Sequence, residues 1–280
     1  MDSKQDERFE KRLRFVARRY KEDSLDTEKA WKRFAAREGI RRSIPFVRYW
    51  IAAASVLVLL VGFGWLYRME RDRPEWVSVM TVAGEVKNVY LPDSTQVSMA
   101  GNSSLKYDRK RYGKERRAVE MTGKAFFQVK RNEARPFSVH TQLTEVTVLG
   151  TSFQVKEGEK ATGVDVMTGK VRFSAHDVSD PVILTAGMSA SYSEEKKDIE
   201  IGTERDVNKL SWKTKRLHFQ DTPLAKVIED LSNCYQTEIT CKAGASDSRL
   251  TATFNNLPLG EVLLVINQTL DVRLVSQERK

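Results

Sequence analysis

The residue types that most often carry out chemistry are few and scattered in this 280-residue chain. Its three histidines, His140, His176 and His218, have no Cys, Glu or His at the spacing of a metal ligand. A Gly-x-Ser-x-Gly nucleophile turn is also missing from the sequence. We therefore expect no conventional enzyme, no metal and no cofactor, and catalysis is the rival class of function.

The tripeptide Thr-Gly-Lys occurs twice, at residues 122–124 and 168–170, and enters an aromatic strand each time. A phosphate-binding loop needs glycines further upstream and a helix after its lysine, and neither copy has them. Both copies are therefore interpreted as hairpin turns.

An uncharged run of nineteen residues, from Tyr49 to Tyr67, stands out in a chain that is 30% charged. As a helix it spans about 28 Å, close to the roughly 30 Å of a bilayer's hydrocarbon core. Aromatic rings stand at both of its ends, where they suit a membrane interface. A buried core helix and a cleaved signal peptide are the alternatives, but the preceding leader is far too long for a signal peptide. The sequence predicts one transmembrane helix over residues 49–67.

The balance of Lys and Arg across this segment predicts its orientation. Seven basic residues lie within about 20 residues upstream and four lie downstream. They are Lys29, Lys32, Arg33, Arg37, Arg41, Arg42 and Arg48 upstream, and Arg68, Arg71, Arg73 and Lys87 downstream. Because the more basic flank stays in the cytoplasm, we expect a cytoplasmic N-terminus and an exported C-terminal part.

The net charge of +9 is concentrated in the N-terminal tail. Residues 1–48 contain 15 Lys and Arg against 9 Asp and Glu, so this tail supplies +6 of the total. Basic residues beside the cytoplasmic leaflet follow from the orientation alone. Direct binding of nucleic acid is therefore not needed to explain the charge.

The tail, residues 1–48, has the periodicity of two short amphipathic helices. Phe9, Leu13, Val16 and Tyr20 line one stripe of the first helix. The second has Ser24 or Asp26 as its cap, then Ala30, Trp31, Phe34 and Ala35, and a stop at Gly39. Helices this short are marginal in water on their own. We expect the stripes to dock on a partner protein, on each other or on the membrane lipid of the inner leaflet.

Beyond Pro74 the hydrophobic period changes to two, which indicates an all-β domain over residues 68–205. Short runs of β-branched and aromatic residues alternate with turn residues, and a sandwich, a jelly roll or a short solenoid would all fit. The predicted strands are Val77–Val82, Val86–Leu91, Gln96–Met99, Ala118–Met121, Phe126–Val129, Phe137–His140, Glu145–Leu149, Phe153–Val155, Gly163–Met167, Val171–Phe173 and Val182–Leu184.

Residues 206–280 contain a repeat, because Phe219–Val227 returns 35 residues later as Phe254–Val262. Each copy reads as a strand, a proline at a helix start and a helix, and strands 237–241 and 272–275 follow. Two β-α-β units sharing one small sheet are predicted, which is an α+β domain. Its cysteines, Cys234 and Cys241, could form a disulfide in an oxidising compartment, or remain buried thiols on the apolar side of their elements.

Five blocks of the exported part resemble the FecR family of transmembrane anti-sigma factors. These blocks are residues 91–97, 102–107, 120–129, 135–139 and 148–155. Ser94 departs from the family, which usually has Gly after Pro-Asp, so the local turn type is open. The C-terminal repeat is similar to the module found at the N-terminus of secretins and TonB-dependent receptors, known as STN.

The resemblance implies a signalling protein of the bacterial inner membrane. Its exported, periplasmic part would read the signalling domain of an outer-membrane TonB-dependent transducer, and its tail would bind an extracytoplasmic-function sigma factor. The implied sigma-binding candidates are Phe9, Leu13, Val16, Tyr20, Trp31 and Phe34. A structural protein of the envelope or cell wall is the alternative.

Gly150-Thr151 gives one further hypothesis, because some members of this family are thought to cleave themselves at a Gly-Thr bond. A threonine hydroxyl can attack the preceding carbonyl when strain aligns the two groups. A plain turn at a strand entry is the alternative.

Overall fold

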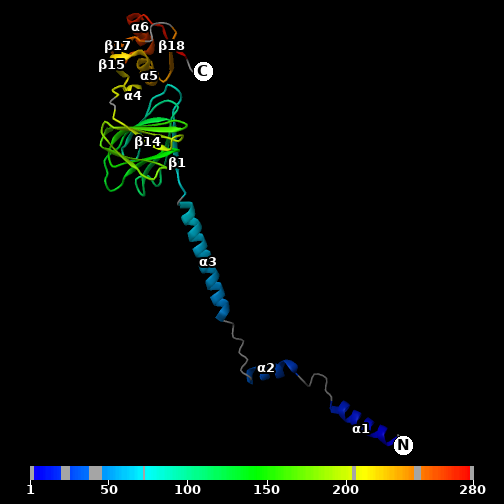
Figure 1. Ribbon diagram of the computed structural model, residues 1–280. Helices are drawn as coiled ribbons and strands as arrows, with labels where there is room; N and C mark the ends of the chain where they lie inside the picture. The colour runs from blue at the N-terminus through cyan, green and yellow to red at the C-terminus, as the bar shows by residue number, and fades with distance from the viewer. Residues whose placement is uncertain are drawn as a thin grey trace. The chain divides into compact units, whose positions relative to one another are not determined.

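The computed structural model describes residues 3–19, 26–37, 46–71, 73–203, 206–242 and 247–277. The chain divides into two compact units, Met1–Arg73 and Pro74–Lys280. The first unit is helical, and the second holds a large β region followed by a small α+β region (Figure 1).

The first unit contains α1 (Ser3–Arg19), α2 (Thr27–Arg37) and α3 (Phe46–Arg71). The N-terminus of α2 is capped by Asp26, whose carboxylate accepts a hydrogen bond from the Lys29 amide at 2.9 Å. The other predicted cap, Ser24, and the predicted stop at Gly39 lie outside the described residues. Two helices were expected in the tail, and two are observed.

Helix α3 contains the predicted segment 49–67 and extends beyond it at both ends. It is long and apolar enough to cross a membrane, and the protein buries none of its apolar window. One apolar helix near the N-terminus is consistent with a single-pass membrane protein.

The β region is a sandwich of two seven-stranded sheets, and a solenoid is excluded. The first sheet has the order β1-β4-β5-β7-β8-β11-β12, and the second has the order β14-β13-β10-β9-β6-β3-β2. The first sheet's strands are β1 (Trp76–Met80), β4 (Ser104–Asp108), β5 (Arg117–Thr122), β7 (Phe137–His140), β8 (Thr144–Val148), β11 (Lys170–Ala175) and β12 (Val182–Thr185). The second sheet's strands are β2 (Lys87–Tyr90), β3 (Gln96–Met99), β6 (Lys124–Gln128), β9 (Ser152–Glu157), β10 (Ala161–Thr168), β13 (Ser189–Ser193) and β14 (Asp198–Gly202).

A single apolar core fills the space between these sheets. Phe127 and Phe153 of the second sheet stack at 5.2 Å between ring centroids. Phe127 also meets Phe137 of the first sheet at 6.0 Å. All three rings are buried, so alternate residues of both sheets interdigitate as in other sandwiches.

The two Thr-Gly-Lys tripeptides are corners between the sheets, and their interpretation as hairpin turns is wrong. The first copy leads from β5 to β6 and the second from β10 to β11, and each pair of strands lies in different sheets. Gly123 and Gly169 have φ of +82° and +84°, where glycine is favoured. A Cβ on Gly123 would lie 2.6 Å from Ser103 Oγ, and one on Gly169 would lie 2.7 Å from Thr151 Oγ1. Each corner therefore requires glycine for two reasons: its backbone conformation is one that glycine favours, and a side chain would have no room.

A buried ion pair joins the turn before β3 to the start of β5. Arg117 Nε donates to Asp93 Oδ2 at 2.7 Å, and both side chains are shielded from water. The same carboxylate accepts from the amide and the hydroxyl of Thr95, at 3.0 and 2.8 Å. Ser94, where the turn type was open, has φ of +66°, which is the left-handed conformation that glycine adopts most easily.

The guanidinium of Arg117 also ties down the segment that leads into β7. It donates to the carbonyl oxygens of Arg135 at 3.0 Å and Lys130 at 2.8 Å. A buried charge is tolerated only when it is paired and its remaining donors are satisfied, and both conditions hold here.

The C-terminal region contains α4 (Ser211–Thr214) and two copies of strand, helix and strand. The copies are β15 (Arg216–Pro223), α5 (Leu224–Tyr235) and β16 (Glu238–Cys241), then β17 (Arg249–Asn255), α6 (Leu259–Leu270) and β18 (Leu274–Gln277). The repeat extends to the backbone, because equivalent residues adopt positive φ, Asp221 with Asn256 and Gln236 with Asp271.

The single shared sheet that we predicted for this region is wrong. Strand β15 pairs with β17 and β16 pairs with β18, in two separate two-stranded sheets. The first strand of each copy pairs with the first strand of the other copy, and likewise for the second strands. Each repeat therefore contributes one strand to each sheet, so neither repeat can form its sheet alone.

The two cysteines differ in environment, and no disulfide joins them. The buried-thiol expectation is confirmed for Cys234 and wrong for Cys241, which is exposed. Cys241 is the last residue of β16, which lies in a sheet of only two strands among the described residues.

The buried ion pair generates a prediction about stability. Replacing Asp93 by Asn keeps the size of the side chain but leaves the Arg117 charge uncompensated in the interior. We expect the free energy of unfolding to fall by about 3–5 kcal/mol, measured by urea denaturation of the full-length protein in mild detergent. The exposed pair Lys106–Glu120 lies across β4 and β5, so Glu120→Gln is the matched control and should cost less than about 1 kcal/mol.

The same variant should change the response to acid. Burial opposes ionisation of Asp93, but hydrogen bonds from Thr95 and Arg117 outweigh it and hold its pKa below the usual value. Because the folded-state pKa is the lower one, the stabilisation is present above about pH 4 and is lost as the pH falls through the folded pKa. In Asp93→Asn, the free energy of unfolding should therefore fall less between neutral and acid pH than in the wild type. If its dependence on pH is the same in both proteins, the role given to the Asp93 carboxylate is wrong.

Candidate functional site

The predicted sigma-binding side chains of the tail are exposed. Phe9, Leu13, Val16, Trp31 and Phe34 lie between 52% and 66% exposed. Tyr20, the remaining candidate, lies outside the described residues. Trp31 and Phe34 stack on each other at 5.7 Å in α2. These are large apolar surfaces that the first unit does not bury, which is unusual for side chains of this size.

The stripe on α1 can be told apart from the rest of that helix. At 100° per residue, Phe9, Leu13 and Val16 fall within about 60° of one another, whereas Phe15 lies roughly 120° away from the middle of the stripe. Phe15 is equally exposed, and the Arg19 guanidinium lies 4.6 Å from its ring centroid. Phe15 is therefore an exposed apolar residue of the same helix that lies outside the stripe and can serve as a control.

The second candidate site is the junction between the sandwich and the C-terminal region. Trp212 of α4 is fully buried in a small cluster with Ala100 and Phe126 of the sandwich. Its indole Nε1 donates to Gln154 Oε1 of β9 at 2.6 Å. Helix α4 itself packs against α5 and β15, so its tryptophan anchors the C-terminal region to the outer face of the second sheet.

A chain of polar contacts continues from that anchor. Gln154 Nε2 donates to Asp165 Oδ2 at 3.1 Å, and Lys209 Nζ contacts Asp165 Oδ1 at 2.6 Å. The sandwich supplies Gln154 and Asp165, and α4 supplies Trp212. Lys209 comes from residues 206–210, which lead from the sandwich to α4 and are called the connecting segment below. Gln154 and Asp165 thus each have a hydrogen-bond partner on the other side of the junction, as buried polar groups require.

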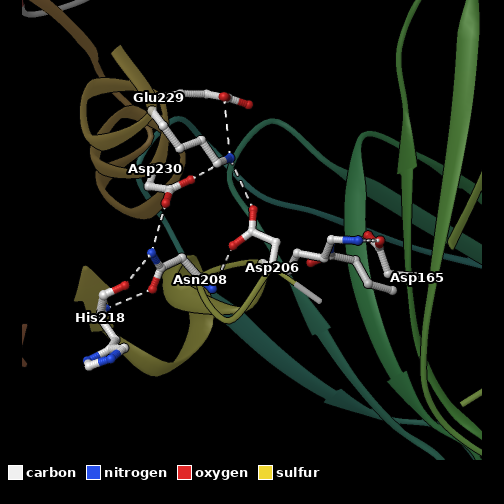
Figure 2. Close-up of polar contacts among 9 residues, drawn as sticks. Asp165, Asp206, Asn208, His218, Glu229 and Asp230 are labelled. Carbon is white, nitrogen blue, oxygen red and sulfur yellow. Dashed lines mark hydrogen bonds and ion pairs between the residues drawn. The ribbon is translucent and has the colours of Figure 1, made fainter. Parts of the chain in front are cut away.

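A network beside it, shown in Figure 2, fixes the connecting segment onto α5. Lys226 Nζ lies 2.8 Å from Asp230, 3.1 Å from Asp206 and 3.3 Å from Glu229. Asn208 Nδ2 donates to Asp230 at 2.8 Å, and Asn208 Oδ1 accepts from the His218 amide at 2.8 Å. Burial favours the neutral amine, but the hydrogen bonds and charges of Asp230 and Asp206 outweigh it and raise the pKa of Lys226.

This acidic cluster already has its cation. Among the described residues, no group of three or more His, Cys, Asp or Glu side chains has the geometry to hold a metal ion. Lys226 occupies the position between the carboxylates where a cation would bind. These contacts hold the C-terminal region in a fixed position against the sandwich.

The Gly150-Thr151 bond lies at the entry to β9. Thr151 is buried, and its hydroxyl donates to the Lys170 carbonyl oxygen at 2.9 Å. A Cβ on Gly150 would approach Arg131 Cα to 2.5 Å, so close packing requires glycine here. Self-cleavage at this bond stays a prediction.

Two separate segments of the chain match models of related families. Residues 78–172 match the family described as FecR protein, and residues 216–280 match the family described as FecR, C-terminal. Together these matches span more than half of the chain and support its assignment to the FecR family. A search of curated proteins found no match.

Two similar crystal structures come from Parabacteroides distasonis, each described as that of a candidate anti-sigma factor. Their sequences are 27% and 28% identical to this one, with a TM-score of 0.55 in both cases. The similarity covers 74% and 73% of this chain and 100% of each of those chains.

Sequence reasoning missed the junction. Trp212 stands in a short segment rich in lysine, and its apolar neighbours Val207 and Leu210 form no recognisable period. Gln154 offered a faint signal, because it is a polar residue between Phe153 and Val155 in a strand whose two faces both turn out to be buried. The role of such residues depends on tertiary contacts, which the local spacing of residue types does not reveal.

Trp212 should hold the C-terminal region in place. We expect Trp212→Ala to cost about 3–5 kcal/mol at the junction, because a fully buried indole and its hydrogen bond are both lost. Limited proteolysis of the full-length protein should then cut within residues 203–215 much faster than in the wild type. Trp76→Ala is the matched control, since Trp76 is 45% exposed, and equal cleavage of both variants would contradict the anchoring role.

Proposed function

We propose that this chain, whose matches support assignment to the FecR family, is a single-pass anti-sigma factor of the bacterial inner membrane. Its tail binds an extracytoplasmic-function sigma factor, and its periplasmic part responds to the signalling domain of an outer-membrane TonB-dependent transducer. The observation that carries the proposal is the joint occurrence of a FecR-type β region, one apolar helix and an exposed apolar stripe before it. The similarity to a candidate anti-sigma factor supports it.

The tail has the physical properties of a docking element. Its large exposed side chains, Phe9, Leu13, Trp31 and Phe34, are of the type that supplies most of the binding energy at interfaces. The excess of Lys and Arg around them favours an acidic partner surface and speeds encounter with it. Lipid of the inner leaflet competes for the same stripe, and a binding experiment separates the two.

For the transducer we favour the C-terminal region as the contact surface. Its two sheets have only two strands each, so in the described part of the chain each strand has a neighbouring strand on one side only. On the other side of β15, the Asn208 side chain already bonds the N–H and the C=O of His218, which leaves the edges of the other strands as the better candidates. An extended segment of the signalling domain could add to such an edge by β-augmentation. The suggested likeness to STN modules belongs to this proposal.

The junction gives this arrangement a route for the signal. A partner that binds the C-terminal region pulls or turns it against the sandwich through Trp212 and Lys209, and the sandwich follows directly after the membrane helix in the chain. If the C-terminal region were joined to the sandwich only by a flexible linker, its movement would not be passed on to the sandwich. We therefore propose that residues 74–280 respond to the partner as one unit.

Self-cleavage at Gly150-Thr151 remains a secondary proposal that a denaturing gel tests. Two fragments of the exported part in the wild type and one full-length band in Thr151→Ala would support it. A full-length band alone, unchanged in Thr151→Ala, would end it.

The sigma-binding stripe predicts a specific loss. In a lysate of the native bacterium, the tagged full-length protein should co-purify a sigma factor, and Leu13→Asp should reduce its recovery at least tenfold. A carboxylate in the middle of an apolar interface must be desolvated without a partner, which makes the variant strongly disfavoured.

Phe15→Asp is the control, because it puts the same charge on the same helix but off the stripe. It should leave recovery of the sigma factor within about twofold. Equal loss in both variants would mean that the charge acts through the membrane or the helix as a whole. Full recovery with Leu13→Asp would remove the stripe from the sigma contact.

A further inference from the structure

Two lysines face each other directly on the outer face of the sandwich, beside the junction. Lys124 of β6 and Lys156 of β9 are Cα partners in an antiparallel pair. Directly opposed residues have Cβ atoms about 4.5–5.5 Å apart and share one face of the sheet, and like charges in that arrangement destabilise it. Such a pair calls for an anion that compensates it.

Among the described residues, neither lysine has a carboxylate within ion-pair distance, although the nearby Lys209 and Lys226 are both paired. The Lys124 ammonium lies over the Trp212 ring, 5.5 Å from its centroid. Burial lowers the pKa of Lys124 to about 8, and the charge of Lys156 adds to this effect. The charges of Asp165 and Asp206 act on Lys124 in the opposite direction but do not outweigh burial.

The lysine pair lines a cavity of about 510 Å³ between the sandwich and the C-terminal region. Its wall also contains Trp212, Asn233 and Gln236. Gln236 Oε1 accepts from the Gly101 amide at 2.6 Å, while its Nε2 is a buried donor without a partner in the described part of the chain. The volume lies in the range of small-molecule sites.

The wall also holds two carboxylates, Glu157 and Glu238, and neither forms an ion pair with the two lysines in the described part of the chain. Glu157 Oε2 is buried without a hydrogen-bond partner there. Glu157 Oε1 accepts from the Gln142 amide at 2.6 Å, and burial raises the pKa of Glu157. Glu238 is exposed at the start of β16. The adjoining carboxylates Asp206, Glu229 and Asp230 share one ammonium, that of Lys226. They line a neighbouring cavity together with Lys124 and Lys156, but none of them is within ion-pair distance of these two lysines among the described residues.

We propose that the cavity between the sandwich and the C-terminal region is a binding site for an oxyanion, a carboxylate or phosphate group held between Lys124 and Lys156. Such a ligand would bridge strands of the sandwich to the region that carries α5, since both line the cavity. It would therefore strengthen the docking of the C-terminal region and act as a small-molecule or peptide input at the junction. This inference does not rest on the proposed sigma or transducer partners.

The test is calorimetry on the full-length protein in non-ionic detergent, with inorganic phosphate, citrate and a short Glu-rich peptide as probes. At pH 7 the wild type should bind at least one of them, and Lys124→Met and Lys156→Met should each weaken binding at least tenfold. Lys160→Met, in the exposed turn between β9 and β10, removes the same charge elsewhere and should bind as the wild type does. Binding of phosphate or citrate assigns the site to free anions, and binding of the peptide alone assigns it to a partner chain.

Protonation gives a second readout. An anion restores the pKa of Lys124 toward its ordinary value, so binding near pH 8.5 should take up a fraction of a proton, and affinity should fall as the pH rises above 8. Lys124→Arg, which keeps the charge, should retain most of the affinity. The proposal fails if no probe binds, if the two Met variants bind as tightly as Lys160→Met, or if Lys124→Arg is folded but loses as much affinity as Lys124→Met.

Discussion

The burial of Trp212 against the sandwich is the constraint on which the arrangement of the second unit depends. An indole buries a large apolar area and needs a partner for its N–H, and Gln154 provides that partner inside the interface. Because α4 packs against α5 and β15, fixing the indole fixes the first repeat of the C-terminal region. The ion pairs of Lys209 and Lys226 then restrict the connecting segment further. The cavity with its two lysines exists only because the two regions are held in this way.

The sandwich can serve as the fixed side of this junction because its own strands are tied together internally. The Asp93–Arg117 pair links the turn before β3, in the second sheet, to β5 and the approach to β7, in the first. The glycine corners at 123 and 169 carry the chain from one sheet to the other without disturbing the core. Buried ion pairs add little stability over an apolar core, but they are intolerant of losing one partner, which suits a rigid support.

Much of this fold could be predicted from the amino-acid sequence because hydrophobic period and turn residues act locally. All eleven predicted strands of the sandwich are present, and the 35-residue repeat reappears in matching backbone conformations. Strands β4, β13 and β14 alternate polar and apolar residues but hold only two apolar residues each, so the signal was too short to be recognised as a strand. The sheet pairing of the C-terminal region and the corner role of Thr-Gly-Lys depend on contacts between distant segments. The same holds for the roles of Trp212, Lys124 and Lys156, which depend on contacts between distant segments, so local spacing could not reveal them.

The orientation of the chain in the membrane decides whether these surfaces can act together as proposed. The stripe on α1 must face the cytoplasm, while the sandwich and the junction must lie on the other side. Alkaline phosphatase is active only outside the cytoplasm, so its fusion after Lys280 in a bacterial host measures the orientation directly. The account predicts high phosphatase activity for this fusion and none for a fusion before Met1. The reverse pattern would place the β region in the cytoplasm and contradict the account.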